Sequence, residues 1–129
     1  MIWHRGVIQK LTASGLFYEC FVIGAKIRAP INDTLFLDIY YDPTTKSYSY
    51  GLVDSELPYK GDKRILGWDD YPHEGIKEMK ALKSYPHHFQ FRKNEKWVFD
   101  DSPLRGDIMK DIEVVIKAVS EYLRSSTTV

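Results

Sequence analysis

The fold is decided by residues 35–53, which read LFLDIYYDPTTKSYSYGLV. In the first part, Leu35, Leu37 and Ile39 alternate with more polar neighbours, and residues 47–53 alternate again. A period of two is typical of strands with one buried face. The residues between them, Asp-Pro-Thr-Thr-Lys at 42–46, have the composition of a turn. The stretch therefore predicts an antiparallel β-hairpin.

Further strands are predicted on both sides of this hairpin. Residues 16–27 are apolar on both alternating faces, which predicts one strand that is covered on both sides or paired centrally. Residues 64–68 form a short strand pattern, and residues 89–91 and 97–99 flank a polar turn, which predicts a second hairpin.

Two amphipathic helices are predicted at the ends of the chain. Residues 2–13 have apolar side chains at helical spacing, and residues 108–124 carry a clear apolar stripe. Ser102-Pro103 resembles a helix start, and Asp107 is an alternative cap. This order predicts an α+β fold, with a mostly antiparallel sheet of about five or six strands and both terminal helices packed on one of its faces.

Composition limits the class of protein. The 129 residues suit a single domain, 1–129, and the 18 basic and 18 acidic residues cancel, which argues against binding nucleic acid by bulk charge. Cys20 is the only cysteine, so an internal disulfide and a thiolate metal cage are both excluded. No signal peptide is recognisable, and no apolar run approaches the ~20 residues of a membrane span. We therefore expect a cytoplasmic protein with no membrane partner.

Histidines are concentrated in two short motifs, Trp68-Asp-Asp-Tyr-Pro-His73 and Tyr85-Pro-His-His-Phe-Gln90. His73 follows a predicted strand, and His87 and His88 begin another. Because adjacent strand residues point to opposite faces, only one of this pair can easily share a site with His73. Histidines beside carboxylates suit acid–base chemistry. The alternative is that they are loop histidines bonded to the backbone.

Asp69 and Asp70 precede the first of these histidines. We expect one of them to accept a hydrogen bond from an imidazole in a shared pocket, with Tyr71 and Tyr85 at its rim. The other interpretation is a charged turn that ends a strand. Without an HExxH helix or a cysteine pair, a metal site is the less favoured hypothesis, so neither a metal nor another cofactor is expected.

Basic and aromatic side chains are interleaved in the middle third of the chain, around the histidine motifs. This combination suits phosphates and stacked bases, as in proteins that hold single-stranded RNA. Arg64 or a nearby lysine is the candidate for holding a phosphate. An ordinary solvated surface is the alternative, because acidic residues dilute the stretch.

The two histidine motifs, the hairpin before them and the C-terminal helix resemble the TumE family of small toxins from toxin–antitoxin pairs. The family positions carried over are Asp69, Pro72, His73, His87 and His88. The sequence departs from the family pattern in having Asp70 where asparagine is common, and Glu74 and Gln90 where histidines often stand. The resemblance implies a cytoplasmic toxin and a cognate antitoxin, often a helix-turn-helix DNA-binding protein.

These expectations combine into a TumE-like toxin that is RNA-directed, as a metal-independent ribonuclease. The candidate catalytic residues are His73, His87, His88 and Asp69. The candidate substrate-binding residues are Arg64, Tyr71, Tyr85 and Asp70. In this hypothesis the RNA 2′-hydroxyl is the attacking group, so no protein nucleophile is needed. The alternative from another class is a non-enzymatic module that recognises a protein or nucleic acid. The sequence leaves open whether the chain forms a homodimer.

Overall fold

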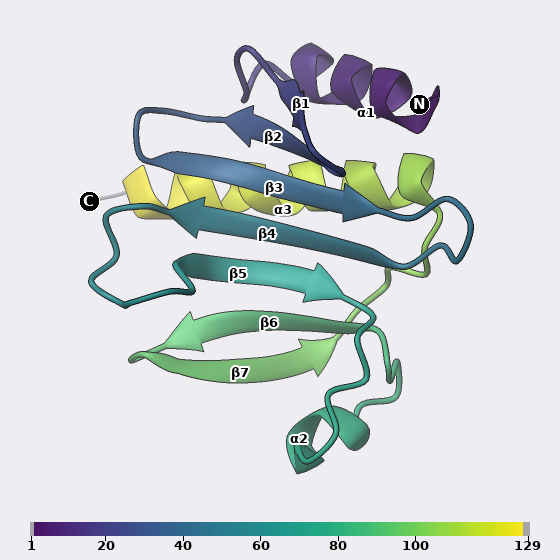
Figure 1. Ribbon diagram of the computed structural model, residues 1–129. Helices are drawn as coiled ribbons and strands as arrows, with labels where there is room; N and C mark the ends of the chain where they lie inside the picture. The colour runs from purple at the N-terminus through teal and green to yellow at the C-terminus, as the bar shows by residue number, and fades with distance from the viewer. Residues whose placement is uncertain (1, 128–129) are drawn as a thin grey trace.

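The computed structural model describes residues 2–127, which form a seven-stranded antiparallel sheet and three helices (Figure 1). The strands lie in the sheet in their sequence order, so each pairs with the next along the chain. The elements are α1 (Ile2–Ala13), β1 (Phe21–Ile23), β2 (Lys26–Pro30), β3 (Leu35–Tyr41), β4 (Tyr48–Asp54), β5 (Arg64–Asp69), α2 (Lys77–Lys80), β6 (His88–Lys93), β7 (Lys96–Asp101) and α3 (Ile108–Thr127).

The central hairpin is formed by β3 and β4, as the sequence predicted. Their register runs from Tyr41 opposite Tyr48 to Leu35 opposite Asp54. Asp42 organises the turn, since its carboxylate accepts the Thr44 N–H and its carbonyl accepts the Lys46 N–H. Along β3 the buried and half-buried residues alternate strictly, which is the burial expected for a strand with one covered face.

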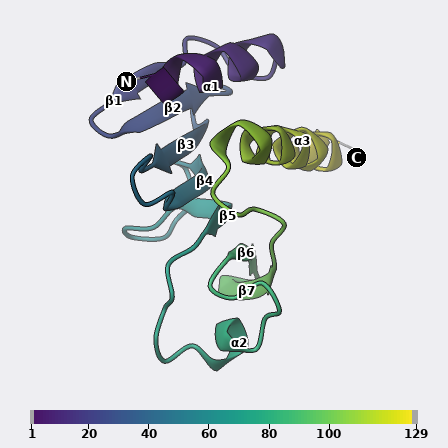
Figure 2. The ribbon, with the colours of Figure 1, turned by 90° about the vertical axis from the view of Figure 1, so that its right-hand side faces the viewer.

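Helices α1 and α3 cover one face of this sheet and contact each other (Figure 2). Val7 and Leu11 of α1 pack there with Ile112, Val115 and Val119 of α3 and with the inward side chains of β2 to β5. The predicted α+β architecture, with both terminal helices on one face, is confirmed. No helix in the described part of the chain, residues 2–127, has both the length and the apolarity that a membrane crossing needs.

The N-terminal β region differs from the prediction of one central strand over residues 16–27. Gly24, at φ 60°, turns the chain between β1 and β2, so this region contributes an edge hairpin instead. All three residues of β1 are exposed, and Cys20 just before it is half-buried. The high apolar content of residues 16–27 concealed the turn, and the sheet therefore has seven strands instead of five or six.

Helix α3 begins at Ile108, directly after Asp107, so the helix start predicted at Ser102-Pro103 is wrong. Residues 102–107 instead form an irregular connection. Within it the Ser102 hydroxyl accepts the Leu104 N–H, and the Asp111 carboxylate of α3 accepts the N–H groups of Arg105 and Gly106. Serine and proline occur in such turns as well as at helix starts, which is why the motif was ambiguous.

Candidate functional site

The face of the sheet opposite α1 and α3 carries the candidate site. Asp69, the last residue of β5, pairs with His88, the first residue of β6. Register places both on this open face, in one row with Ser49 and Tyr40. The expectation that the two motifs meet at neighbouring strand ends is therefore confirmed.

Asp69, His73 and His88 form a compact cluster there. The Asp69 Oδ1 atom lies 3.2 Å from Nε2 of His88 and 4.0 Å from Nε2 of His73. The two imidazoles meet edge to face, with ring centroids 5.5 Å apart. Oδ1 also accepts the Tyr71 N–H at 3.0 Å, which fixes the carboxylate at the start of the loop that carries His73.

His88 is fully buried, and both of its ring nitrogens have partners. Nδ1 lies 3.0 Å from the carbonyl oxygen of Pro86, and Nε2 lies 3.0 Å from Oε1 of Gln90. A carbonyl oxygen can only accept, so Nδ1 carries a proton and donates it to Pro86. His88 therefore cannot touch a substrate directly, and its position within the cluster suits a supporting role.

His73 is the accessible histidine of the cluster, with a side chain 37% exposed. Its ring also packs edge to face on Tyr71, at 4.7 Å between centroids. An open hollow of about 430 Å³ adjoins it, lined by Tyr71, Pro72, His73, Glu74 and Ile76. Tyr71 thus lies at the rim as expected, whereas Tyr85 does not line this hollow.

His87 and Asp70 lie outside the cluster. His87 points to the helix-covered side, where its Nδ1 is 2.8 Å from the Tyr48 hydroxyl and the two rings stack. Burial, and next the charge of Arg105, lower the pKa of His87. Asp70 accepts hydrogen bonds from the Ser47 hydroxyl and the Tyr48 N–H, so it holds the β3–β4 turn region.

Arg64 lies at the opposite end of β5 from Asp69, so it does not join the histidines. Its guanidinium makes a bidentate ion pair with Asp62, at 3.0 and 2.8 Å. The carbonyl of Arg64 accepts a hydrogen bond from Arg92, whose guanidinium also lies over the rings of Tyr59 and Trp97. This end of the open face is therefore rigidly organised by basic and aromatic groups.

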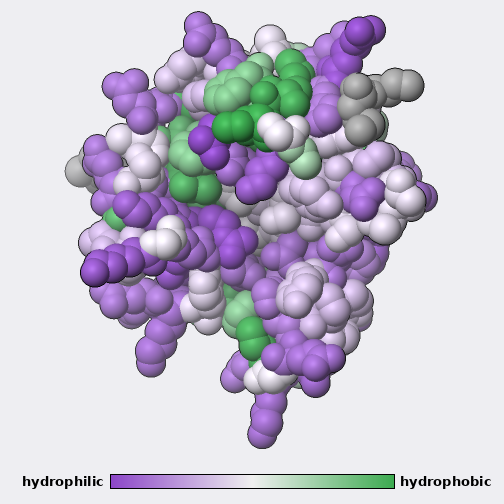
Figure 3. Space-filling view, viewed as in Figure 1, coloured by the Kyte–Doolittle hydropathy of each residue, from purple (hydrophilic) through white to green (hydrophobic). Residues whose placement is uncertain are grey.

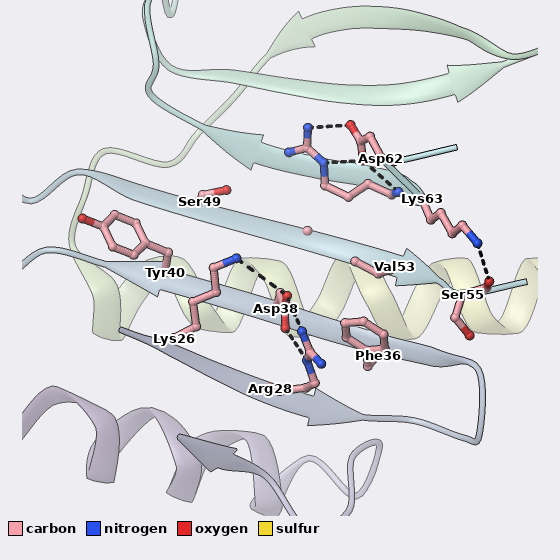
Figure 4. Close-up of a pocket in the computed structure, with 13 residues that line it drawn as sticks. Lys26, Arg28, Phe36, Asp38, Tyr40, Ser49, Val53, Ser55, Asp62 and Lys63 are labelled. Carbon is pink, nitrogen blue, oxygen red and sulfur yellow. Dashed lines mark hydrogen bonds and ion pairs between the residues drawn. The ribbon is translucent and has the colours of Figure 1, made fainter. Parts of the chain in front are cut away.

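Arg64 does line a second hollow, of about 610 Å³, on the open face of β2 to β5 (Figure 4). Four basic residues line it, against two carboxylates: Lys26, Arg28, Lys63 and Arg64, with Asp38 and Asp62. Figure 4 shows Lys26 and Arg28 reaching from β2 toward Asp38 on β3. The aromatic rings of Phe36 and Tyr40 lie on the same face.

A glycine of β4, Gly51, lines this hollow. Gly51 of β4 lies opposite Gly67 of β5. A Cβ atom on Gly67 would lie 2.6 Å from the carbonyl oxygen of Tyr50, so only glycine fits there without a backbone shift. Seen as a surface from the same side, the open face is mainly hydrophilic, and a hydrophobic patch lies over β1 (Figure 3).

In comparisons with known proteins, no family model, no curated protein and no solved structure matches the chain.

Gln90 belongs to the site, although the sequence analysis named it only as a departure from the family pattern and not as a candidate site residue. Its side chain closes the cluster beneath His88, because residues two apart on β6 share a face. That spacing was visible in the sequence. The three ligand atoms of Asp69, His73 and His88 lie within 4.8 Å of one another, close enough to hold one metal ion between them. The sequence offered these donors as possible metal ligands but did not favour a metal site, because it contains no HExxH helix or cysteine pair.

Proposed function

We propose that the protein is an RNA-directed toxin of the TumE type, which holds single-stranded RNA on the open face of its sheet and cleaves it near His73. The observation that carries this proposal is that the accessible histidine, its carboxylate and the basic, aromatic hollow all share one face. Cationic and aromatic groups together suit phosphates and unstacked bases.

His73 is the acid–base group in this proposal. Its Nε2 faces the Asp69 carboxylate, which favours the tautomer with a proton on Nε2 and leaves Nδ1 able to accept one. His73 would take the proton of an RNA 2′-hydroxyl. The 2′-oxygen then forms a bond to the adjacent phosphorus while the bond to the 5′-oxygen breaks. The 5′-oxygen receives a proton from water, and the hydroxide that remains takes the proton held by His73. The products are a 2′,3′-cyclic phosphate and a 5′-hydroxyl.

The other members of the cluster are positioning residues. Asp69 orients His73, His88 lies beside Asp69 within the sheet, and Gln90 contacts His88. The sequence suggested that His73 and one of His87 or His88 act as base and acid, and this proposal keeps only His73 in contact with RNA. His88 is fully buried and His87 faces the opposite side, so His73 alone can reach RNA.

The partner in this proposal is a cognate antitoxin, a helix-turn-helix protein encoded beside the toxin, as the resemblance implies. Expression of the wild-type chain in a bacterium should arrest growth, and co-expression of the neighbouring gene should relieve the arrest. If expression of the wild-type chain left growth unaffected, the proposal that the protein is a toxin would be contradicted.

The chemical test is an RNA cleavage assay in the presence of a chelator. Purified wild-type protein should convert single-stranded RNA to fragments with 2′,3′-cyclic phosphate ends, and RNA methylated at its 2′-oxygens should resist. Positioned acid–base groups contribute roughly 10²–10⁴-fold, so His73→Ala should lose at least about 10²-fold in rate. The matched control is His87→Gln, which changes a histidine outside the cluster. Equal rates for wild type and His73→Ala would contradict the mechanism.

One observation favours a second function, binding without cleavage. Only one histidine of the cluster is accessible, whereas general acid–base cleavage commonly uses two groups. In that case the open face would hold RNA and release it unchanged. RNA retained by wild-type protein with no cyclic phosphate formed would assign the protein to this class.

A further inference from the structure

Three metal-ligating side chains converge at one point of the open face. They are Asp69 at the end of β5, His73 in the loop after β5 and His88 at the start of β6. Their ligand atoms all lie within 4.8 Å of one another. Two of them are fixed by the sheet itself, since Asp69 and His88 are paired across β5 and β6. The third comes from the loop after β5, in which the Tyr71 N–H is bonded to Asp69.

The hydrogen bonding of His88 prepares its Nε2 as a ligand. Nδ1 donates to the carbonyl of Pro86 at 3.0 Å, so in the neutral ring the lone pair is on Nε2. A second hydrogen bond of this kind is what orients the histidine ligands of metal sites. Here that lone pair faces two oxygens, Oδ1 of Asp69 at 3.2 Å and Oε1 of Gln90 at 3.0 Å, which places electron-rich atoms against one another. A cation between them removes the conflict.

The distances suit a small transition-metal ion. Two ligands at about 2.1 Å from a tetrahedral zinc ion lie about 3.4 Å apart. The His88–Asp69 distance of 3.2 Å is close to that value, and the His73–Asp69 distance of 4.0 Å exceeds it by about 0.6 Å. His73 is half-exposed on a loop, so it can make the small movement required. Two imidazoles and one carboxylate suit zinc better than calcium or magnesium, which prefer oxygen ligands.

We propose that Asp69, His73 and His88 bind one zinc ion through Oδ1, Nε2 and Nε2. Three protein ligands leave a fourth position for water, on the accessible side where His73 borders the hollow with Tyr71. His87, although next in sequence to His88, takes no part because its ring lies on the helix-covered side with Tyr48.

Zinc binding competes with the proton transfer proposed above, and this consequence alone rests on the proposed function. With zinc on Nε2 of His73, the ring proton resides on Nδ1, which then can no longer accept the proton of a 2′-hydroxyl. Zinc should therefore inhibit the cleavage, and a chelator should restore it. The binding site itself does not depend on any activity.

The direct test is calorimetric titration of the chelator-treated full chain with zinc. Wild type should bind one ion per chain at micromolar affinity or tighter. His73→Ala and Asp69→Asn should each weaken binding at least about 10-fold, the range seen when metal sites lose a ligand or its support. His73→Ala removes an exposed loop side chain, and Asp69→Asn keeps an oxygen for the Tyr71 N–H, so both variants should fold. The matched control, His87→Gln, should bind zinc as wild type does.

A second measurement uses only the wild-type protein, so its result does not depend on whether the variants fold. Cobalt in place of zinc gives visible absorption that is strong for four-coordinate and weak for six-coordinate ions, and wild type should give the strong form. Absence of stoichiometric zinc binding to wild type, or equal affinity in His73→Ala and wild type, would overturn the proposed site. Zinc binding without any RNA cleavage would support the site and contradict the proposed function. RNA cleavage that requires zinc would support the zinc site and contradict the inference that zinc inhibits the cleavage.

Discussion

Two tyrosines on the same face of β4 differ in hydrogen bonding within the described part of the chain: the hydroxyl of one is bonded, and the hydroxyl of the other is not. Tyr48 and Tyr50 are both buried on the helix-covered face, with ring centroids 5.5 Å apart. The Tyr48 hydroxyl contacts Nδ1 of His87 at 2.8 Å and donates to the carbonyl of Leu104 at 3.4 Å. The Tyr50 hydroxyl has no hydrogen-bond partner among residues 2–127. The two residues therefore form a matched pair for measuring what a buried hydroxyl contributes.

Tyr50→Phe should raise the free energy of unfolding by about 1 kcal/mol, because it removes an unpaired buried hydroxyl. Tyr48→Phe should lower it by about 1–2 kcal/mol, because its hydrogen bonds disappear and a nitrogen of His87 is left without its partner. Denaturant unfolding of the two variants measures both values. If Tyr50→Phe were as destabilising as Tyr48→Phe, the Tyr50 hydroxyl would have to be bonded in solution.

Alkaline pH provides a separate test of the same pair. Burial raises the pKa of both tyrosines above the ordinary 10.0. Above about pH 10 the unfolded chain therefore loses protons that the folded chain keeps, so stability falls as the pH rises. The fall should be shallower in Tyr50→Phe than in wild type, because one of the buried hydroxyls is gone. Thermal midpoints between pH 8 and about 11 would measure it; parallel curves would contradict the burial of this hydroxyl.

At the residue scale, sequence predicted the composition of the cluster but not which histidine joins it. Alternation along a strand established that His87 and His88 point to opposite faces. The choice of His88 depends on register, since Asp69 pairs with His88 across β5 and β6. Register is set by the tertiary packing of Trp68 and Phe89 on the other face, and a single sequence does not show that pairing.

At the element scale, the close approach of β4 and β5 depends on glycine. A Cβ atom on Gly67 would meet a backbone oxygen at 2.6 Å, whereas one on Gly51 would meet the flexible side chain of Arg64 at 2.8 Å. Gly67→Ala should therefore lower the free energy of unfolding by about 1–3 kcal/mol. Gly51→Ala should lower it less, because Arg64 can move. Chemical denaturation compares them, and equal losses would show that the backbone at Gly67 shifts freely.

Helix α3 is held to the sheet by its apolar stripe. Ile112 is fully buried among the residues of the core, so Ile112→Ala should cost about 2–5 kcal/mol. Val114, 40% exposed on the same helix, is the control, and Val114→Ala should change stability by less than about 0.5 kcal/mol. Calorimetric unfolding measures both. An unchanged midpoint in Ile112→Ala would mean that the stripe faces a partner instead of the sheet.

Strong periodicity made the central hairpin and α3 predictable, and its absence hid the edge hairpin. Residues 35–53 and 108–124 each have one apolar face, which specifies both the element and its orientation. Residues 16–27 are largely apolar on both alternating faces, so little contrast between polar and apolar residues marked the turn at Gly24. The strands follow their sequence order in the sheet, and the pairing that local patterns do not encode is that of β5 with β6, which are separated by residues 70–87.

At the scale of the whole molecule, one face of the sheet packs against helices and the other carries the candidate functional residues. Helices α1 and α3 fill one face (Figure 1), and the other face carries the basic hollow (Figure 4). The histidine cluster lies on that second face too. A chain with no net charge thus presents more cations than carboxylates in one hollow of its surface. Local concentration of charge, and not the total, is what a nucleic acid responds to at short range.

Charge reversal on the two faces tests this division directly. Lys26→Glu with Lys63→Glu changes the open face, and Lys110→Glu with Lys117→Glu makes the same change in total charge on exposed positions of α3. The open-face variant should bind single-stranded RNA at least about 10-fold more weakly, and its dependence on salt should be shallower by about 0.7 for each RNA phosphate that the variant no longer neutralises. The α3 variant should match wild type in both. Fluorescence anisotropy over a salt series measures these quantities. Equal weakening in the two variants would mean that RNA responds only to total charge, and the open face would then not be the binding surface.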